Sequence, residues 1–96
     1  MHARLLTMNV GPGQRQRMLA LADESLDFNK SIPGFVGAHY FVFDEARGDY
    51  GSLTLWSNAA DAEAAGEKLR PWLQEKVGAL LTAAPDVRHA EVYQPS

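Results

Sequence analysis

Residues 35–56 read FVGAHYFVFDEARGDYGSLTLW, two apolar runs separated by one polar loop. Residues 35–43 are rich in aromatic and β-branched side chains, which favour strands, and residues 50–56 have the same character. The loop DEARGD between the two runs offers Gly48 for a left-handed backbone position. The stretch therefore predicts a β-hairpin.

The chain before the hairpin predicts a strand followed by a helix. Residues 3–10, ARLLTMNV, carry apolar side chains on both alternating faces and end at the turn-forming sequence GPG, residues 11–13. We therefore predict a strand that is covered on both sides. From Gln14 to about Lys30 apolar residues recur at helical intervals, which predicts an amphipathic helix that stops at the sequence IPG, residues 32–34.

The chain after the hairpin predicts two helices. Ser57 or Asn58 is placed to cap the first, and Asp61 lies where a carboxylate stabilises the first turn of a helix. Gly66 is expected to break this helix. A second helix is expected to begin near Arg70, because a proline follows and apolar residues then recur at positions 73, 77, 80 and 84.

The order of the predicted elements defines a fold class. Pro85 closes the second helix, and residues 87–93 alternate as a last strand. The order predicts an α+β, ferredoxin-like (split βαβ) domain over residues 1–96, with a four-stranded antiparallel sheet and helices on one face. Because the strands carry apolar side chains on both faces, the other face needs a cover. A twofold-related second copy is the expected cover, which predicts a homodimer and a dimeric α/β barrel.

Composition limits the partners of the chain. Its 96 residues include 9 basic and 12 acidic ones, and the formal net charge of −3 gives no basic field for nucleic acid. No apolar run approaches the roughly 20 residues of a membrane span, and the segment MHARLLTMNV lacks the features of an export signal. Without cysteine there are neither disulfides nor thiolate metal sites. We expect a cytoplasmic protein that binds neither nucleic acid nor membranes.

Three stretches resemble the antibiotic biosynthesis monooxygenase family of dimeric α/β barrels: IPGFVGAHY (32–40), GSLTLWSNAADAEAA (51–65) and LRPWLQEKVGALL (69–81). The sequence PGF before a strand, and a strand that ends in tryptophan before a helix, are typical of that family. The resemblance implies a pocket between sheet and helices that accepts a flat or apolar small molecule. Some members oxygenate aromatic polyketides without a cofactor, whereas relatives degrade haem or act on quinones, so membership leaves the chemistry open.

Trp56 matches the pocket tryptophan of the polyketide-oxidising members. Its indole offers an apolar wall and one N–H donor. Those members carry an asparagine four residues earlier and a tyrosine six residues later, where this chain has Ser52 and Ala62. The alternative is that Trp56 is a core residue that closes the end of the sheet.

Two further candidates follow from the same resemblance. Asn9 resembles in position the asparagine of the haem-degrading relatives; the alternative is an amide that caps a turn. Those relatives also need a histidine ligand, which the stretch AGEKLRPWLQEK (65–76) lacks, so haem ligation is not expected. Trp72 is either an aromatic lid at the pocket mouth or a packing residue of the last helix.

The internal histidines are His39 and His89. Their strands lie at opposite edges of the predicted sheet and no ligand spacing is present, so no metal site is predicted. His39 alternates with phenylalanines, which makes it either a pocket base or a neutral, hydrogen-bonded core histidine. We also expect substrate contacts from Ser52, Trp72 and Tyr40.

These observations lead to two functional hypotheses. The first is a monooxygenase without metal, flavin or other cofactor that oxidises an electron-rich aromatic or quinol. In it Trp56 and Asn9 donate hydrogen bonds to the substrate anion and His39 acts as base. The second is a non-enzymatic protein of the same fold that binds a small hydrophobic metabolite, which the changed positions Ser52 and Ala62 favour.

Overall fold

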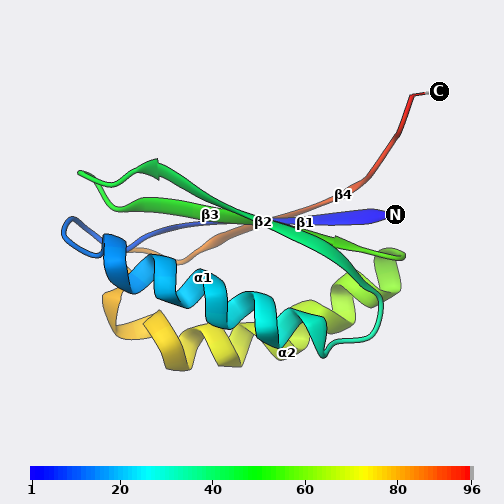
Figure 1. Cartoon of the computed structure of the whole chain (residues 1–96), viewed down its shortest axis with the longest axis horizontal. Helices are drawn as coiled ribbons and strands as arrows, with labels where there is room; N and C mark the ends of the chain where they lie inside the picture. The colour runs from blue at the N-terminus through cyan, green and yellow to red at the C-terminus, as the bar shows by residue number, and fades with distance from the viewer. Residues whose placement is uncertain (96) are drawn as a thin grey trace.

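A computed structural model describes residues 1–95 as one four-stranded sheet with two long helices on one of its faces (Figure 1). The elements are β1 (His2–Asn9), α1 (Arg15–Lys30), β2 (Phe35–Asp44), β3 (Asp49–Trp56), α2 (Ala59–Val77), the 3-10 turn η1 (Gly78–Leu80) and β4 (Asp86–Glu91). The strand order is β2-β3-β1-β4, and every neighbouring pair is antiparallel. The α+β, ferredoxin-like arrangement predicted from the sequence is confirmed.

The hairpin predicted at residues 35–56 consists of β2 and β3, paired from Phe35 opposite Trp56 to Asp44 opposite Asp49. Gly48 has φ +86° in the connecting turn, and its N–H donates to the carbonyl of Asp44 at 2.9 Å. Only glycine adopts this backbone region without strain. The left-handed position expected of Gly48 is therefore confirmed.

The prediction of two helices after the hairpin is wrong, because α2 runs unbroken through Gly66 and Pro71. Gly66 is buried, and a Cβ atom placed on it would lie 3.4 Å from Nε of Arg4 on β1. The residue therefore lets the helix pass close to an arginine rather than ending it. Pro71 removes one N–H from the helix, and buried Leu69 and Val77 on either side hold the helix against the sheet.

The ends of α2 differ in how well the sequence predicted them. Asn58 is the N-cap, since its side chain accepts a hydrogen bond from the backbone N–H of Asp61 at 2.8 Å, as one of the two alternatives had it. The C-terminal end lies earlier than predicted. The helix ends at Val77, η1 follows, and Ala84 lies exposed outside any helix.

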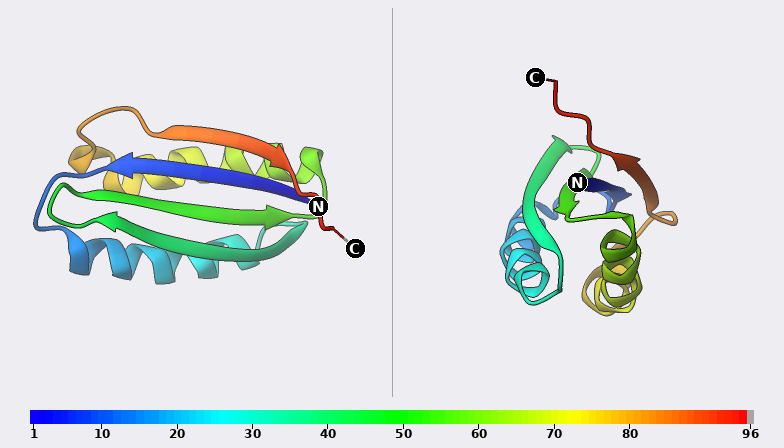
Figure 2. Two further views of the ribbon diagram at one scale, coloured as in Figure 1. Left: turned by 90° about the horizontal axis from the view of Figure 1, so that it is seen from above. Right: turned by 90° about the vertical axis from the view of Figure 1, so that its right-hand side faces the viewer.

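The two faces of the sheet differ in what covers them. Both helices lie against one face, side by side in the end view (Figure 2). Within residues 1–95 no helix or strand lies over the other face, so these residues themselves cover β1 on one side only (Figures 1 and 2). On that uncovered face Leu5, Leu53 and Leu55 are half-buried, and Phe43 is 57% exposed. The second copy expected there remains a prediction.

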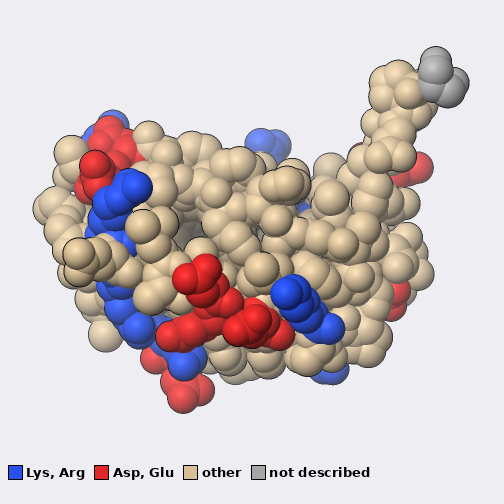
Figure 3. Space-filling view, viewed as in Figure 1, with Lys and Arg blue, Asp and Glu red and all other residues tan. Residues whose placement is uncertain are grey.

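The helix-covered side contains two separate apolar clusters. The first consists of Val10, Met18, Leu21, Tyr50 and Val77. The second consists of Ile32, Trp56, Ala62, Ala65 and Leu69. The outward face of α1 is charged, with acidic side chains gathered over it and the surface hollowed above them (Figure 3). In the part of the chain that the structure describes, no helix is both long and apolar enough to cross a bilayer.

Candidate functional site

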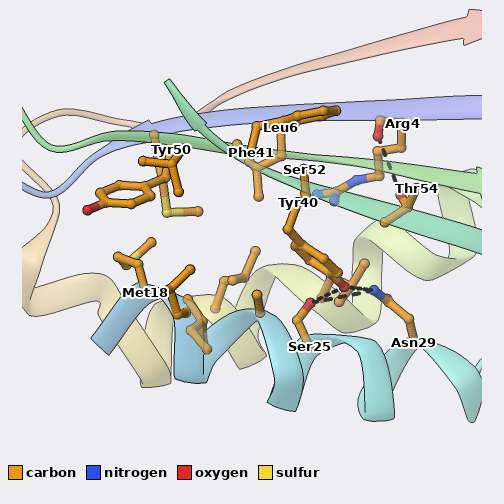
Figure 4. A pocket seen from close by; sticks show the side chains of 18 residues that line it. Arg4, Leu6, Met18, Ser25, Asn29, Tyr40, Phe41, Tyr50, Ser52 and Thr54 are labelled. Carbon is orange, nitrogen blue, oxygen red and sulfur yellow. Dashed lines mark hydrogen bonds between the residues drawn. The ribbon is translucent and has the colours of Figure 1, made fainter. Parts of the chain in front are cut away.

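A cavity of about 70 Å³ lies between α1 and the covered face of the sheet (Figure 4). Along β3 the helix-facing residues are Tyr50, Ser52, Thr54 and Trp56. Tyr50, near the start of the strand, belongs to the first apolar cluster, and Trp56, at its end, belongs to the second. Polar side chains occupy the stretch between. We call the six polar residues that line the cavity there the polar belt: Arg4, Ser25, Asn29, Tyr40, Ser52 and Thr54.

The strand register brings the sheet members of the belt together. Arg4 on β1 pairs with Thr54 on β3, and Ser52 pairs with Tyr40 on β2. All four side chains share the helix-covered face, because residues two apart on a strand point the same way. The belt therefore crosses three neighbouring strands at one level.

Helix α1 completes the belt with Ser25 and Asn29, which are one turn apart and both buried. The hydroxyl of Tyr40 donates to Oγ of Ser25 at 3.2 Å and accepts from Nδ2 of Asn29 at 3.2 Å (Figure 4). Within residues 1–95 the buried Oδ1 of Asn29 has no donor. This network fixes the ring of Tyr40 at the cavity and leaves one acceptor free.

Arg4 is the charged member of the belt and is 5% exposed. Its guanidinium extends from β1 toward Ser52 and Tyr40 (Figure 4). Among residues 1–95 its buried Nε has no hydrogen-bond partner, and none of the ion pairs includes it. Burial, with a smaller contribution from the charge of Arg70, lowers the pKa of Arg4 below its usual value. The cavity thus contains a desolvated cation without a counter-ion in the described chain.

Trp56 lies in the second apolar cluster and does not line the cavity. Its side chain is fully buried, and its Nε1 donates a hydrogen bond to Oγ1 of Thr54 at 2.9 Å. The ring of Phe35 packs edge-on against the indole, with 5.4 Å between the ring centroids. The single N–H of the indole is therefore occupied. This geometry corresponds to the core alternative for Trp56.

Asn9 lies at the opposite end of β1 from Trp56, because Asn9 pairs with Asp49 whereas Trp56 pairs with His2. Its Nδ2 donates to the carbonyl of Arg47 at 2.8 Å and to Oδ1 of Asp49 at 2.7 Å. Its Oδ1 accepts from the N–H of Gly11 at 3.0 Å and from Thr82 at 2.6 Å. The amide ties three loops together, as the turn-capping alternative described, and shares no pocket with Trp56.

The remaining predicted site residues separate into two groups. Ser52 and Tyr40 line the cavity. His39 pairs with Leu53 on the uncovered face, so the sheet separates it from the cavity and it cannot act there as a base. Trp72 stacks on Phe28 at 5.1 Å, which joins α2 to α1 rather than forming part of the cavity lining.

Sequence reasoning missed Arg4, Ser25, Asn29 and Thr54. A signal for them exists in the pattern. Arg4 alternates with Leu6 and Met8 on one strand face, and Ser25 and Asn29 continue the helical stripe of Met18 and Leu21. Polar residues at positions that the period assigns to the core indicate buried polar chemistry.

A second, wider hollow of about 530 Å³ lies between α2 and strands β1 and β4. It shares Arg4, Leu6 and Leu73 with the cavity, so Arg4 stands where the two meet. His89 lies on β4 opposite Arg4 of β1. It lines this outer hollow together with exposed Glu63 and Glu67. Within residues 1–95 no three His, Cys, Asp or Glu side chains are grouped as a metal site requires.

Comparison with known proteins gives matches in structure alone. No family model and no curated sequence matches the chain. A provisional antibiotic biosynthesis monooxygenase from Bordetella bronchiseptica superposes with a TM-score of 0.77 at 17% identity, covering 97% of each chain. A mutant of SnoaB, a cofactor-independent oxygenase from Streptomyces nogalater, gives 0.72 at 14% identity, covering 98% of this chain and 94% of that one.

A third similar structure contains a ligand. It is a monooxygenase from the gene ActVA-Orf6 of Streptomyces coelicolor in complex with nanaomycin D, with a TM-score of 0.72 at 18% identity, covering 99% of this chain and 92% of that one. Identities this low establish the fold and leave the activity open. The chain therefore has the fold of structures named antibiotic biosynthesis monooxygenases, as the sequence resemblance implied.

Proposed function

We propose that the chain is a monooxygenase that needs no cofactor and oxidises a small, electron-rich aromatic or quinol. The observation that supports this proposal most is the cavity, in which the buried polar belt faces apolar walls from Leu6, Met8 and Met18. Pockets of this composition take apolar ligands and orient them by a few polar groups. The fold shared with the cofactor-independent oxygenase SnoaB agrees with such chemistry.

With an anthrone, the proposed reaction converts the methylene flanked by aromatic rings into a ketone. With a dihydroquinone, one dioxygen converts a ring C–H into C–OH and leaves a hydroxyquinone and one water. For the anthrone, loss of one proton gives the carbanion, which transfers electrons to dioxygen, and a C–O bond forms to give a peroxide. Protonation of the peroxide, loss of the second C–H proton and cleavage of the O–O bond release water. One substrate and one dioxygen give one ketone and one water, with one oxygen atom in each product.

The belt residues have separable tasks in this reaction. The apolar walls exclude water, which strengthens every electrostatic interaction with the substrate. Tyr40, fixed by Ser25 and Asn29, orients the ring, and Ser52 offers a hydroxyl on the neighbouring strand. The volume of about 70 Å³ holds one ring edge with its oxygen, so a larger substrate extends through the mouth.

Oxygen uptake tests the proposal. An anthrone and a dihydroquinone are supplied with isotopically labelled dioxygen, and uptake is compared with the spontaneous rate. We expect faster uptake, one labelled atom in the product and no hydrogen peroxide. Uptake equal to the spontaneous rate, or stoichiometric release of peroxide, contradicts the assignment as a monooxygenase.

A non-enzymatic binding protein is the second candidate, and one observation favours it. The lining of the cavity contains no carboxylate and no imidazole among the described residues, and Trp56, Asn9 and His39 lie outside it. A protein without a general base in its pocket binds a ligand without needing to turn it over. Ligand-induced stabilisation without oxygen uptake is the outcome that selects this candidate.

The homodimer also stays a proposal, as does the cytoplasmic location. Phe41 and Phe43 stack at 5.7 Å on the uncovered face and are 37% and 57% exposed. Burial of this face against a second copy removes apolar surface from water. We expect a dimer in analytical ultracentrifugation at micromolar concentration and a monomer for Phe43→Glu. A monomeric wild-type chain at that concentration contradicts the proposal.

A further inference from the structure

We propose that Arg4 is the centre of an anion-binding site, and that the ligand of this cavity is a small planar ring carrying an anionic oxygen, a phenolate or a carboxylate. The inference deepens the proposed function and rests on it for the identity of the cavity as the substrate site. It assigns to the substrate a charge that the fold alone does not indicate.

Arg4 is a buried charge that has no ion-pair partner among residues 1–95. Charged side chains are almost never buried unless they are paired, because desolvation costs several kcal/mol. Arg4 is 5% exposed, yet none of the ion pairs of residues 1–95 includes it and its buried Nε has no acceptor. Arg4 therefore lacks a hydrogen-bond acceptor and a counter-ion within residues 1–95, and a bound ligand supplies both.

The carboxylates nearest to Arg4 in the outer hollow do not form an ion pair with it. Glu63 and Glu67 on α2 line the outer hollow beside Arg4, and both are exposed. The described ion pairs of α2 involve neither of them, since Lys76 pairs with Glu24 of α1 at 3.3 Å. Exposed carboxylates keep their hydration, so an anion brought in by a ligand is the better partner for a desolvated guanidinium.

Helix α2 passes close to the side chain of Arg4 at Gly66. Gly66 lies against the guanidinium, where a Cβ atom would lie 3.4 Å from Nε. Thr54 and Ser52 lie beside Arg4 on the same face, and Oδ1 of Asn29 needs a donor. The cavity thus presents a cation with flanking hydroxyls, and an acceptor for a second, protonated oxygen of the ligand.

The buried cation also favours the ionised form of a bound phenol. A phenol bound beside a desolvated cation loses its proton more readily, because the charged form gains the attraction of the cation. The proton passes to the solvent and the anion stays bound. The phenolate formed in this way is electron-rich enough to react with dioxygen. Its formation needs no general base from the cavity lining, which contains neither a carboxylate nor an imidazole.

The experiment uses a probe that dioxygen does not oxidise, so that its result is independent of turnover. 4-Nitrophenol is added to the 96-residue chain at a pH below the pKa of the free phenol, and the phenolate absorption band is recorded. We expect the pKa of the bound phenol to fall by about one unit, a tenfold shift in ionisation. Arg4→Lys is expected to retain part of the shift, and Arg4→Met none.

A matched control separates the local effect from the net charge. Arg88 is exposed on β4 and shares the uncovered face with Leu5, its partner in the sheet. Arg88→Met makes the same chemical change on the other side of the sheet and is expected to keep the full shift. Loss of the shift in Arg88→Met as much as in Arg4→Met overturns the proposal.

A second measurement needs no variant and identifies the source of the anionic oxygen. The wild-type protein is titrated with 2-naphthoate and with its neutral analogue 2-naphthamide. If 2-naphthoate binds about tenfold more tightly than 2-naphthamide, the site takes carboxylates. If the two bind equally but 4-nitrophenol is ionised on binding, the site takes phenolates. Equal binding of both naphthyl compounds together with no phenol ionisation overturns the proposal, whether or not oxygen uptake is found.

Discussion

Trp56 and Arg4 lie on the same covered face of the sheet, on neighbouring strands, and both are almost fully buried. At Trp56 the only polar atom is paired with Thr54 and apolar side chains surround the ring. At Arg4 a charge is buried and, within residues 1–95, its Nε has no partner. The first environment is complete as it stands, whereas the second is complete only with a ligand.

This difference separates stability from function within a few residues. Folding favours satisfied polar atoms and dense packing, and the Trp56 region meets both requirements. Unsatisfied buried groups that lie together in a cavity reduce stability and are found where a protein binds something. The comparison therefore supports our proposal that the polar belt binds the ligand, and it assigns Trp56 to the core.

The largest effect is expected from Trp56→Ala. The change removes a fully buried ring from the second apolar cluster and leaves the hydroxyl of Thr54 without its donor. We expect a loss of about 3–5 kcal/mol in the free energy of unfolding, measured by urea denaturation. A loss below about 1 kcal/mol would mean that the tryptophan is not a packing residue.

Arg4→Met is expected to stabilise the protein. The lowered pKa of Arg4 means that folding disfavours its charged form and so reduces the free energy of unfolding. This loss is fully present below the pKa of Arg4 in the folded protein, and it disappears as the pH rises through that pKa. At neutral pH we therefore expect a gain of about 1–2 kcal/mol, since an apolar side chain of similar length replaces a buried charge. Arg88→Met, exposed, is expected to stay within about 0.5 kcal/mol of wild type.

If Arg4→Met destabilises the protein, the description of the belt is wrong, because Arg4 would then make a stabilising interaction in the ligand-free protein. The free energy of unfolding of both variants is measured at neutral pH by the same urea titration. The opposite signs predicted for Trp56→Ala and Arg4→Met give the clearest contrast between the two regions.

Tyr40→Phe removes one hydroxyl from the network with Ser25 and Asn29. We expect a loss of about 1 kcal/mol, because two buried partners lose a hydrogen bond while the ring still fits. A double-mutant cycle with Ser25→Ala measures the coupling between the two hydroxyls. Additive effects of the two changes would show that the hydroxyls do not act together.

Gly66→Ala has the smallest expected effect. Its Cβ atom meets Nε of Arg4 at 3.4 Å, an ordinary contact, and alanine favours the helix. We expect a gain of about 0.5–1 kcal/mol in thermal unfolding, with anion binding retained. Gly66→Leu is the matched control, since a larger side chain displaces the guanidinium and is expected to weaken binding.

The sequence predicted the fold because its signals are local. The hairpin, the position of Gly48 and the order of the four strands follow from periodicity and turn residues, and Asn58 was one of the two predicted caps. Gly66 misled the prediction of α2, because the packing of Leu69 and Val77 that carries the helix through it involves residues distant in the sequence.

The site was harder to predict, and for a physical reason. Trp56 and Asn9 are residue types that bind ligands, but whether their donors are free depends on Thr54, Asp49 and other residues brought near by folding. Ser52 and Tyr40 were predicted to contact substrate, and they line the cavity. Arg4 was overlooked as one charged residue in an apolar strand, although its place in the alternation indicated that it is buried.

The central claim is that the belt, and not Trp56, binds the ligand. Calorimetric titration of 2-naphthoate into wild type, Trp56→Phe and Arg4→Met tests it directly. The account predicts that Trp56→Phe keeps the dissociation constant within about threefold of wild type, while Arg4→Met raises it at least tenfold, about 1.4 kcal/mol. Weakened binding in Trp56→Phe with unchanged binding in Arg4→Met would contradict it.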